Sequence, residues 1–184
     1  MTIKKSKKKD ICVDFRRVEF IDERYELVAA VAKLANTIGW NDKESQYQKD
    51  MLNYFSNMSN HKAVKFLKKN KILCYNALLD ISVNLQNDFT VIDVNSMDSR
   101  WKAVNIKSFT KYLYDFYIKS NFAGFFNSHS ESYQAANNFF KTKVWDKVDF
   151  SWFSKYVETS KLHAIYSFCE IRKRSIRSKS TGSI

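Results

Sequence analysis

Apolar residues recur at helical spacing from Leu27 onward, directly after a candidate helix start. The apolar positions that lie three or four residues apart are Leu27, Val31, Leu34 and Ile38. This spacing is that of one face of an α-helix. Asp22 is placed as an N-cap, with Glu23 and Glu26 near the positive end of the helix dipole. Gly39 is placed as the C′ residue, so we predict a helix that begins after Asp22 and ends before Gly39.

The same period predicts a series of further helices. In residues 43–58 the apolar face consists of Tyr47, Met51, Tyr54, Phe55 and Met58. The next helix is expected to start at Asn60 as its cap, with Val64 and Leu67 inward and four lysines outward. Helices are also predicted over residues 75–87, in a strongly aromatic stretch that starts at residue 106, and twice within residues 120–144.

Two stretches depart from the helical period. Residues 11–20 partly alternate between apolar and polar side chains, which predicts a short strand. Residues 88–105 predict a long connection with a brief strand at 89–94, and long loops often carry function. Trp101 lies in this connection between Arg100 and Lys102. It could stack on a nucleic-acid base or anchor the loop to the core, and the latter role is the commoner one.

The chain has no proline and three glycines, so it lacks the turn residues that hairpin-rich folds need. We therefore predict a mainly α protein, an orthogonal domain of about six to eight helices with one or two short strands near 11–20 and 88–94. The expected organisation is a basic tail at 1–10, a single helical domain at 11–160, and a helix end with a basic, disordered tail at 161–184. Within 148–158, Trp152, Phe153 and Tyr156 are expected in the core.

The net charge of +12 is concentrated at the two ends of the chain. Residues 1–9 and 161–184 each carry +5, so the middle is nearly neutral. The candidate polyanion-binding residues are Lys4, Lys5, Lys7, Lys8, Lys9, Arg172, Lys173, Arg174, Arg177 and Lys179. Such runs contact phosphates in a salt-dependent way. A solubility tail explains them equally well, and no base-reading motif accompanies them. The lysines at 62–69 are interpreted as a solvated helix face.

No motif for catalysis, cofactor binding or metal binding is present. The isolated glycines cannot form a phosphate-binding loop, and His61, His129 and His163 have no zinc-binding spacing. We expect these histidines at the surface or as helix caps. Cys12, Cys74 and Cys169 are odd in number and far apart, which indicates reduced thiols. The acids at 22–26 and 146–149 are expected to be structural. The chain therefore predicts no bound cofactor and no transmembrane segment.

Several segments in order resemble the N-terminal half of a bacterial domain-of-unknown-function family. These are RRVEFIDERYELVAAVAKLA, YQKDMLNYFSN, HKAVKFLKK, YNALLDISVNL, FTKYLYDFYIKSNFAGFFNSHSESY and VDFSWF, within residues 13–157. Arg24-Tyr25-Glu26-Leu27 corresponds to the R-x-E-L helix of that family. Its members resemble gluzincin-type zinc metallopeptidases, are usually exported, and carry an H-E-x-x-H helix further along. No such helix and no export signal occur in this chain, so no catalytic residue is carried over.

The resemblance implies a non-catalytic helical part of a zinc-metallopeptidase-like protein that forms one wall of a substrate cleft, with zinc bound in a longer form. Its partner would be a missing C-terminal half, or a second copy of the chain. As written the chain is expected in the cytoplasm, and outside it if an export signal has been lost. The alternative is an independent helical module that attaches to nucleic acid or an anionic surface through its basic ends. The sequence does not decide between these interpretations, although we expect the chain alone to be inactive.

Overall fold

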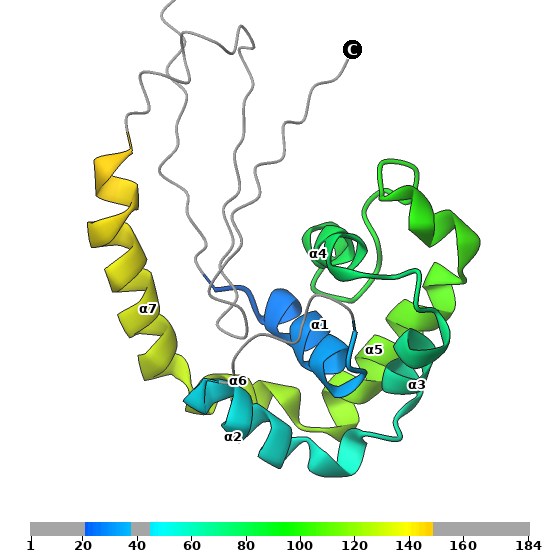
Figure 1. Ribbon diagram of the computed structural model, residues 1–184, viewed down its shortest axis with the longest axis horizontal. Helices are drawn as coiled ribbons and strands as arrows, with labels where there is room; N and C mark the ends of the chain where they lie inside the picture. Colours follow the sequence, from blue (N-terminus) through cyan, green and yellow to red (C-terminus); the bar gives the residue numbers. More distant parts are fainter. Residues whose placement is uncertain (1–20, 38–44, 149–184) are drawn as a thin grey trace, which may run out of the picture.

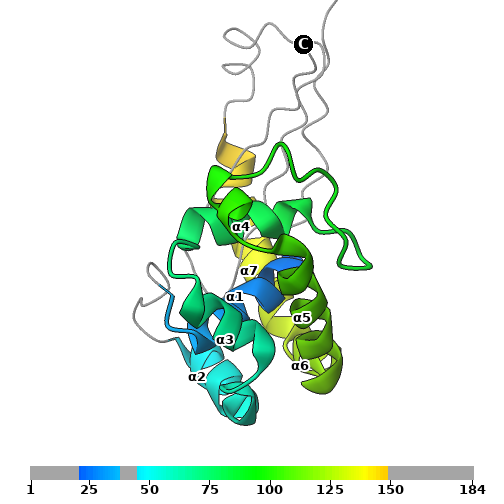
Figure 2. The same cartoon turned by 90° about the vertical axis from the view of Figure 1, so that its right-hand side faces the viewer.

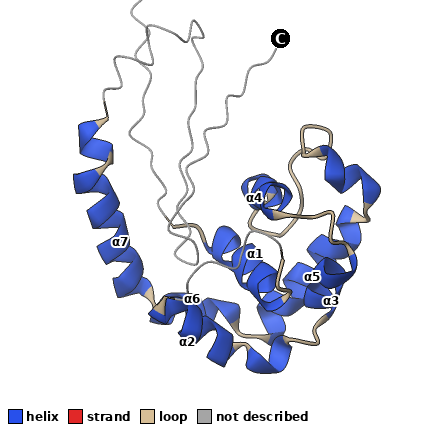
Figure 3. Ribbon diagram, viewed as in Figure 1, coloured by secondary structure: helices blue, strands red, loops and turns tan. Residues whose placement is uncertain are grey.

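The computed structural model describes residues 21–37 and 45–148, and these residues are mainly helical, as predicted (Figure 1). The α-helices are α1 (Glu23–Leu34), α2 (Gln46–Tyr54), α3 (Lys62–Lys69), α4 (Tyr75–Asn84), α5 (Ile106–Lys119), α6 (Phe122–Ser128) and α7 (Ser130–Lys143). Three 3₁₀ turns join them, namely η1 (Ser56–Met58), η2 (Ser99–Ala103) and η3 (Trp145–Lys147). Within these ranges no strand forms (Figure 3). The predicted strand at 11–20 and the expected core residues of 148–158, Trp152, Phe153 and Tyr156, lie outside the described residues.

Helix α1 lies at the centre of the fold. Its residues from Tyr25 to Ala32 are all buried, and it contacts α2, α3, α4, α5 and α6. Helices α3 and α5 contact each other and lie to the right of α1 in Figure 1, so they face the viewer in Figure 2. A helix that is apolar around its whole circumference is buried in a core. The small side chains of Ala29, Ala30 and Ala32 allow neighbouring helices to approach α1 closely.

The N-terminal end of α1 is as predicted, whereas its C-terminal end is not. Asp22 is the N-cap, as predicted, and its Oδ1 accepts the backbone N–H of Arg24 at 2.8 Å. The predicted C′ residue, Gly39, is wrong, because α1 ends at Leu34 and Asn36 takes the left-handed conformation at φ 54°. The N–H groups of Asn36 and Thr37 donate to the carbonyls of Lys33 and Ala32, both at 3.0 Å. This is a Schellman motif, in which Asn is one of the few residues that tolerate positive φ.

Helix α2 is shorter than the predicted 43–58, and α3 begins one residue later than predicted. Ser45 caps α2 in a capping box with Gln48, and the helix gives way to η1 after Tyr54. Tyr54 is 46% exposed, so it is not the core residue that the pattern predicted. His61, not Asn60, caps α3, because its Nδ1 accepts the N–H of Ala63 at 3.2 Å. Val64 and Leu67 are buried and the lysines of α3 are exposed, as expected.

The connection from 88 to 105 is irregular and is anchored by Trp101. The strand predicted at 89–94 does not form, and only an isolated antiparallel bridge joins Leu85 to Val91. Phe89 adopts a left-handed φ of 65°, which breaks the extended run. Trp101 is 1% exposed, so it anchors the loop to the core and cannot stack on a base.

Aromatic rings of α5 and α6 fill the space between the remaining helices. Phe55 at the end of α2 stacks on Phe122 with centroids 5.5 Å apart, and it also meets Phe116 and Phe125. Phe109, Leu113 and Phe116 of α5 are fully buried, and they lie in the aromatic stretch that was predicted to be helical from residue 106. Large rings therefore supply most of the volume of the core between α2, α5 and α6.

Helix α7 departs from this body. It begins beside α2 and α6 and runs along one side of the molecule, away from α3 and α5 (Figure 1). Tyr133 in its second turn is buried, whereas Ala136 and Phe140 are half-buried. A search of the described residues finds no helix long and apolar enough to cross a membrane.

Candidate functional site

The basic residues that the sequence predicts to bind a polyanion lie outside the residues that the structure describes. All ten basic residues of the two ends lie in 1–20 or 149–184. Their role in binding a polyanion stays a prediction. His163, Cys12 and Cys169 also lie outside the described residues, and Cys74 is a free thiol.

The chemistry-bearing side chains that the fold does bring together lie where α1, α2 and α7 meet. Glu26 of α1 is fully buried, and its Oε2 accepts a hydrogen bond from the Tyr47 hydroxyl at 3.0 Å. The hydroxyl oxygens of Tyr47 and Tyr133 are 2.6 Å apart. A phenol has one proton. Because Tyr47 donates its proton to Glu26, Tyr133 donates to Tyr47. We call these three residues the Glu26 cluster.

His129 forms the edge of the Glu26 cluster, between α6 and α7. Its ring lies edge-on to Tyr47 with centroids 5.0 Å apart, and it packs on Phe125 at 4.4 Å. Its Nδ1 lies 2.9 Å from the carbonyl of Phe125. Its Nε2 lies 3.8 Å from Oδ2 of Asp50. With Nδ1–H donating to the carbonyl, the Nε2 atom is the one that faces Asp50.

The hydrogen bonds of the Glu26 cluster tie together helices α1, α2 and α7. Its members come from three helices that are far apart in sequence, and burial strengthens each hydrogen bond. Within the described residues, no group of three His, Cys, Asp or Glu side chains is placed to hold a metal ion. The two hydrogen bonds hold the start of α7 at a fixed angle to the pair α1 and α2.

A second polar contact fixes α3 to α5. His61 Nδ1 accepts at the start of α3, so Nε2 carries the proton and donates to Oδ2 of Asp115 at 2.9 Å. Asp115 also accepts from Lys119 at 3.0 Å. The hydrogen bond from Lys119, and after it the one from His61, lowers the pKa of the Asp115 carboxyl. His61 is thus a capping residue, as the sequence predicted for the histidines.

A third contact joins α5 to the start of α1. The Tyr117 hydroxyl donates to Oε1 of Glu23 at 3.1 Å. Burial, and after it the neighbouring Glu23 carboxyl, raises the pKa of Tyr117. The predicted role of Glu23 as an acid at a helix start is accordingly incomplete, because it also accepts from the adjacent helix.

The sequence interpretation missed the Glu26 cluster. The sequence places Glu26 at the positive end of the helix dipole and Tyr47 on the apolar face of the next helix, with no contact between them. A signal was available, because residues 27–32 are apolar without interruption. Such a helix has no solvent face, so an acid within it needs a buried partner.

Comparison of the chain with family models, with curated proteins and with solved structures gave no match. The resemblance to the metallopeptidase-like family is therefore neither supported nor contradicted by these comparisons.

Proposed function

We propose that this chain is the non-catalytic helical portion of a zinc-metallopeptidase-like protein, in which α7 provides one wall of the substrate-binding site. The proposal rests on the sequence resemblance over residues 13–157 and on the shape and anchoring of α7. The observation that carries it is the contrast between the two halves of α7. Tyr133, near its start, is buried and hydrogen-bonded, whereas Phe139 is 65% exposed.

The anchored half gives α7 a defined direction. The 14 residues of α7 span about 21 Å at 1.5 Å per residue. Tyr133 also packs on Phe126 of α6, with ring centroids 4.7 Å apart. The base of α7 is therefore tied to α1, α2 and α6, which suits a helix that has to hold one side of a binding site in place.

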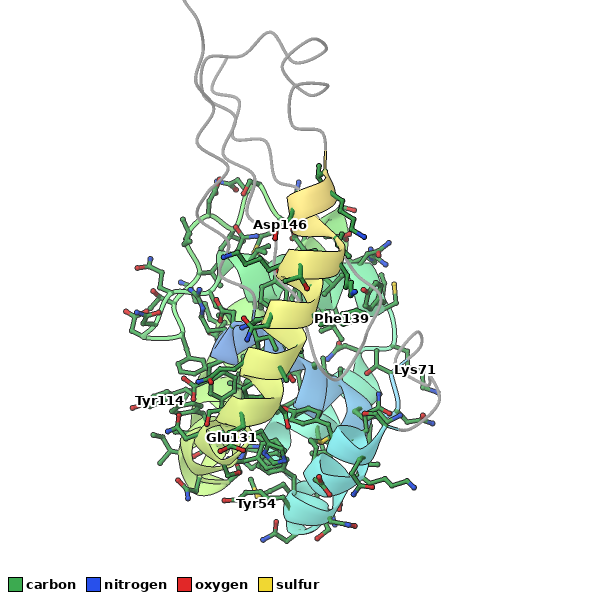
Figure 4. All side chains as sticks on the ribbon, turned by 90° about the vertical axis from the view of Figure 1, so that its left-hand side faces the viewer. Tyr54, Lys71, Tyr114, Glu131, Phe139 and Asp146 are labelled. Atoms are coloured by element: carbon green, nitrogen blue, oxygen red, sulfur yellow. The ribbon has the colours of Figure 1, made fainter. Side chains whose placement is uncertain are left out.

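The distal half carries the contact surface. Phe139 and Val144 are exposed, Phe140 is half-buried, and Lys141 and Lys143 flank them. Figure 4 shows Phe139 beside the middle of α7, between Glu131 at the base and Asp146 beyond the far end. Apolar side chains with a polar rim are typical of surfaces that contact another polypeptide. We assign this surface to the metal-binding half of the protein, or to the peptide bound between the two.

The test has three arms. The chain alone is expected to hydrolyse no peptide and to hold no stoichiometric zinc. The DNA downstream of the Ile184 codon is expected to encode H-E-x-x-H in the same or a shifted frame. When it is expressed as a separate polypeptide, the segment encoded there should co-purify with the chain. Phe139→Ser should reduce this association, and exposed Tyr54→Phe serves as the control.

Turnover of a peptide by the chain alone would contradict the proposal, and so would unrelated sequence downstream. Phe139→Ser could instead convert an oligomer of this chain to a monomer. In that case the surface around Phe139 joins two copies of the chain, and it does not contact a metal-binding half.

A further inference from the structure

The strongest charge asymmetry among the described residues lies on α3 and the turn that follows it. No Asp or Glu occurs from residue 51 to residue 79. The same stretch holds five lysines, all of them exposed, namely Lys62, Lys65, Lys68, Lys69 and Lys71. The residues of α3 that face the core are Ala63, Val64 and Leu67. The lysines of α3 therefore occupy the opposite face, and with Lys71 and Ile72 they form what we call the α3 surface.

Neighbouring side chains hold the α3 surface in shape. Phe66 of α3 packs on Phe109 of α5 with ring centroids 5.2 Å apart. The Lys62 ammonium lies 6.0 Å from the centre of the Tyr112 ring, and Lys68 Nζ lies 3.5 Å from the carbonyl of Ser59. The nearest acid on α5, Asp115, is engaged by His61 and Lys119. The positive charge of the α3 surface is thus not neutralised by α5.

An exposed aliphatic side chain projects at the end of this basic face. The N–H of Leu73 donates to the carbonyl of Asn70 at 2.9 Å, which closes a β-turn with Lys71 and Ile72 at its tip. Ile72 is 50% exposed, while Leu73 turns into the core. Figure 4 shows Lys71 at the edge of the molecule. A helix dipole explains the lysines at the end of α3, but it explains neither Lys62 and Lys65 nor the exposed Ile72.

We propose that the α3 surface binds the anionic surface of a lipid bilayer. Its lysines would lie against lipid headgroups, where each basic residue adds to the attraction. Ile72 at the turn tip would enter the boundary between headgroups and acyl chains. Nucleic acid is the less suitable occupant, because phosphate contacts give no role to an aliphatic side chain. This proposal uses none of the residues of α7 and is independent of the proposed function.

The experiment measures co-sedimentation of the full chain with two kinds of vesicle, phosphatidylcholine alone and phosphatidylcholine mixed with phosphatidylserine. The test variant carries Lys65→Gln, Lys68→Gln and Lys69→Gln. The matched control carries Lys107→Gln and Lys111→Gln on the outer face of α5, together with Lys49→Gln at an exposed position of α2. Both triple variants have the same net charge and the same unchanged ends. Circular dichroism and urea unfolding establish that each is folded.

The expected result is binding to the anionic vesicles only, weakened roughly fivefold for each lysine removed from α3 and much less in the control. Ile72→Ser should weaken the binding that remains at high salt, and replacement of the three α3 lysines by arginine should preserve binding. Equal losses in test and control variants would overturn the proposal, because net charge alone would then explain the attraction. A selective loss of oligonucleotide binding, with vesicle binding unchanged, would also overturn it and would assign the surface to nucleic acid.

Discussion

The indole N–H of Trp101 donates to the carbonyl of Ala77 at a distance of 2.9 Å. This contact ties η2 to α4, and the Trp101 ring also lies 5.4 Å from that of Phe109 on α5. One side chain therefore holds the long connection between α4 and α5 against both helices.

Replacing Trp101 by alanine should lower the free energy of unfolding by about 3–5 kcal/mol, because a large buried ring is lost and a cavity remains. Urea unfolding followed by circular dichroism gives the value. Phe139→Ala removes an aromatic ring of comparable size from an exposed position and should change the free energy by at most about 0.5 kcal/mol. Similar losses in the two variants would mean that the connection is not anchored in this way.

The hydrogen bonds of the Glu26 cluster predict that removing the Tyr47 hydroxyl destabilises the fold more than removing the Tyr133 hydroxyl. Tyr47→Phe removes two hydrogen bonds, the one to Glu26 and the one to Tyr133, which should cost about 2 kcal/mol. Tyr133→Phe removes the bond to Tyr47, while Tyr47 keeps its bond to Glu26, and should cost about 1 kcal/mol. Urea unfolding measures both, with exposed Tyr54→Phe as the neutral control. The reverse order would mean that Tyr47 is not the donor to Glu26.

Amide hydrogen exchange tests whether the hydrogen bond between Tyr47 and Tyr133 holds the whole of α7 in place. Tyr133→Phe should increase the exchange of amides in α7 more than that of amides in α4, because the bond it removes ties α7 to α2. Equal protection of α7 in the wild type and the variant would show that the hydrogen bond to Tyr47 is not needed to hold this helix.

The helices were predictable from the sequence because their faces are read from local spacing. Leu78, Ile81 and Leu85 recur in this way, and all three are buried. The exact ends of helices were less predictable, since they depend on which polar side chain reaches the backbone. His61 rather than Asn60 caps α3, because its ring accepts a backbone N–H. Asn36 rather than Gly39 terminates α1, because Asn36 adopts the left-handed conformation.

The Glu26 cluster depends on contacts between residues that are far apart in sequence. Tyr47 and Tyr133 are separated by 86 positions, and nothing in the local pattern of either helix brings them together. The buried character of Glu26 was accessible from the apolar run beside it. The identity of its partner was not, because it depends on the packing of α1, α2 and α7.

Tyr117 predicts a loss of stability at alkaline pH. Its pKa in the folded protein is raised above the ordinary value of 10.0. The stabilising contribution of Tyr117 is therefore complete below pH 10.0 and is lost as the pH rises through the folded pKa. Tyr117→Phe should show a weaker decline of unfolding free energy above pH 10.0 than the wild type. Exposed Tyr54→Phe should retain the wild-type slope, and an unchanged slope in Tyr117→Phe would refute the assignment.

Asp115 predicts a loss of folding stability at acid pH, whereas Tyr117 predicts one at alkaline pH. Its pKa is lowered below 3.8 by the hydrogen bonds from Lys119 and His61. The contribution of a carboxyl with a depressed pKa is present above 3.8 and is lost as the pH falls through the folded value. Since the side chain is partly exposed, the effect should be small and should weaken in high salt.

Asp115→Asn should therefore lower stability at neutral pH and flatten the dependence below pH 3.8. Urea unfolding at a series of acid pH values measures both changes, and exposed Asp146→Asn controls for the loss of a negative charge. Lys119→Gln should reproduce part of the flattening, because the hydrogen bond from Lys119 is the larger of the two causes of the lowered pKa. If Lys119→Gln leaves the acid dependence intact while Asp115→Asn removes it, the contact with His61 is the dominant one instead.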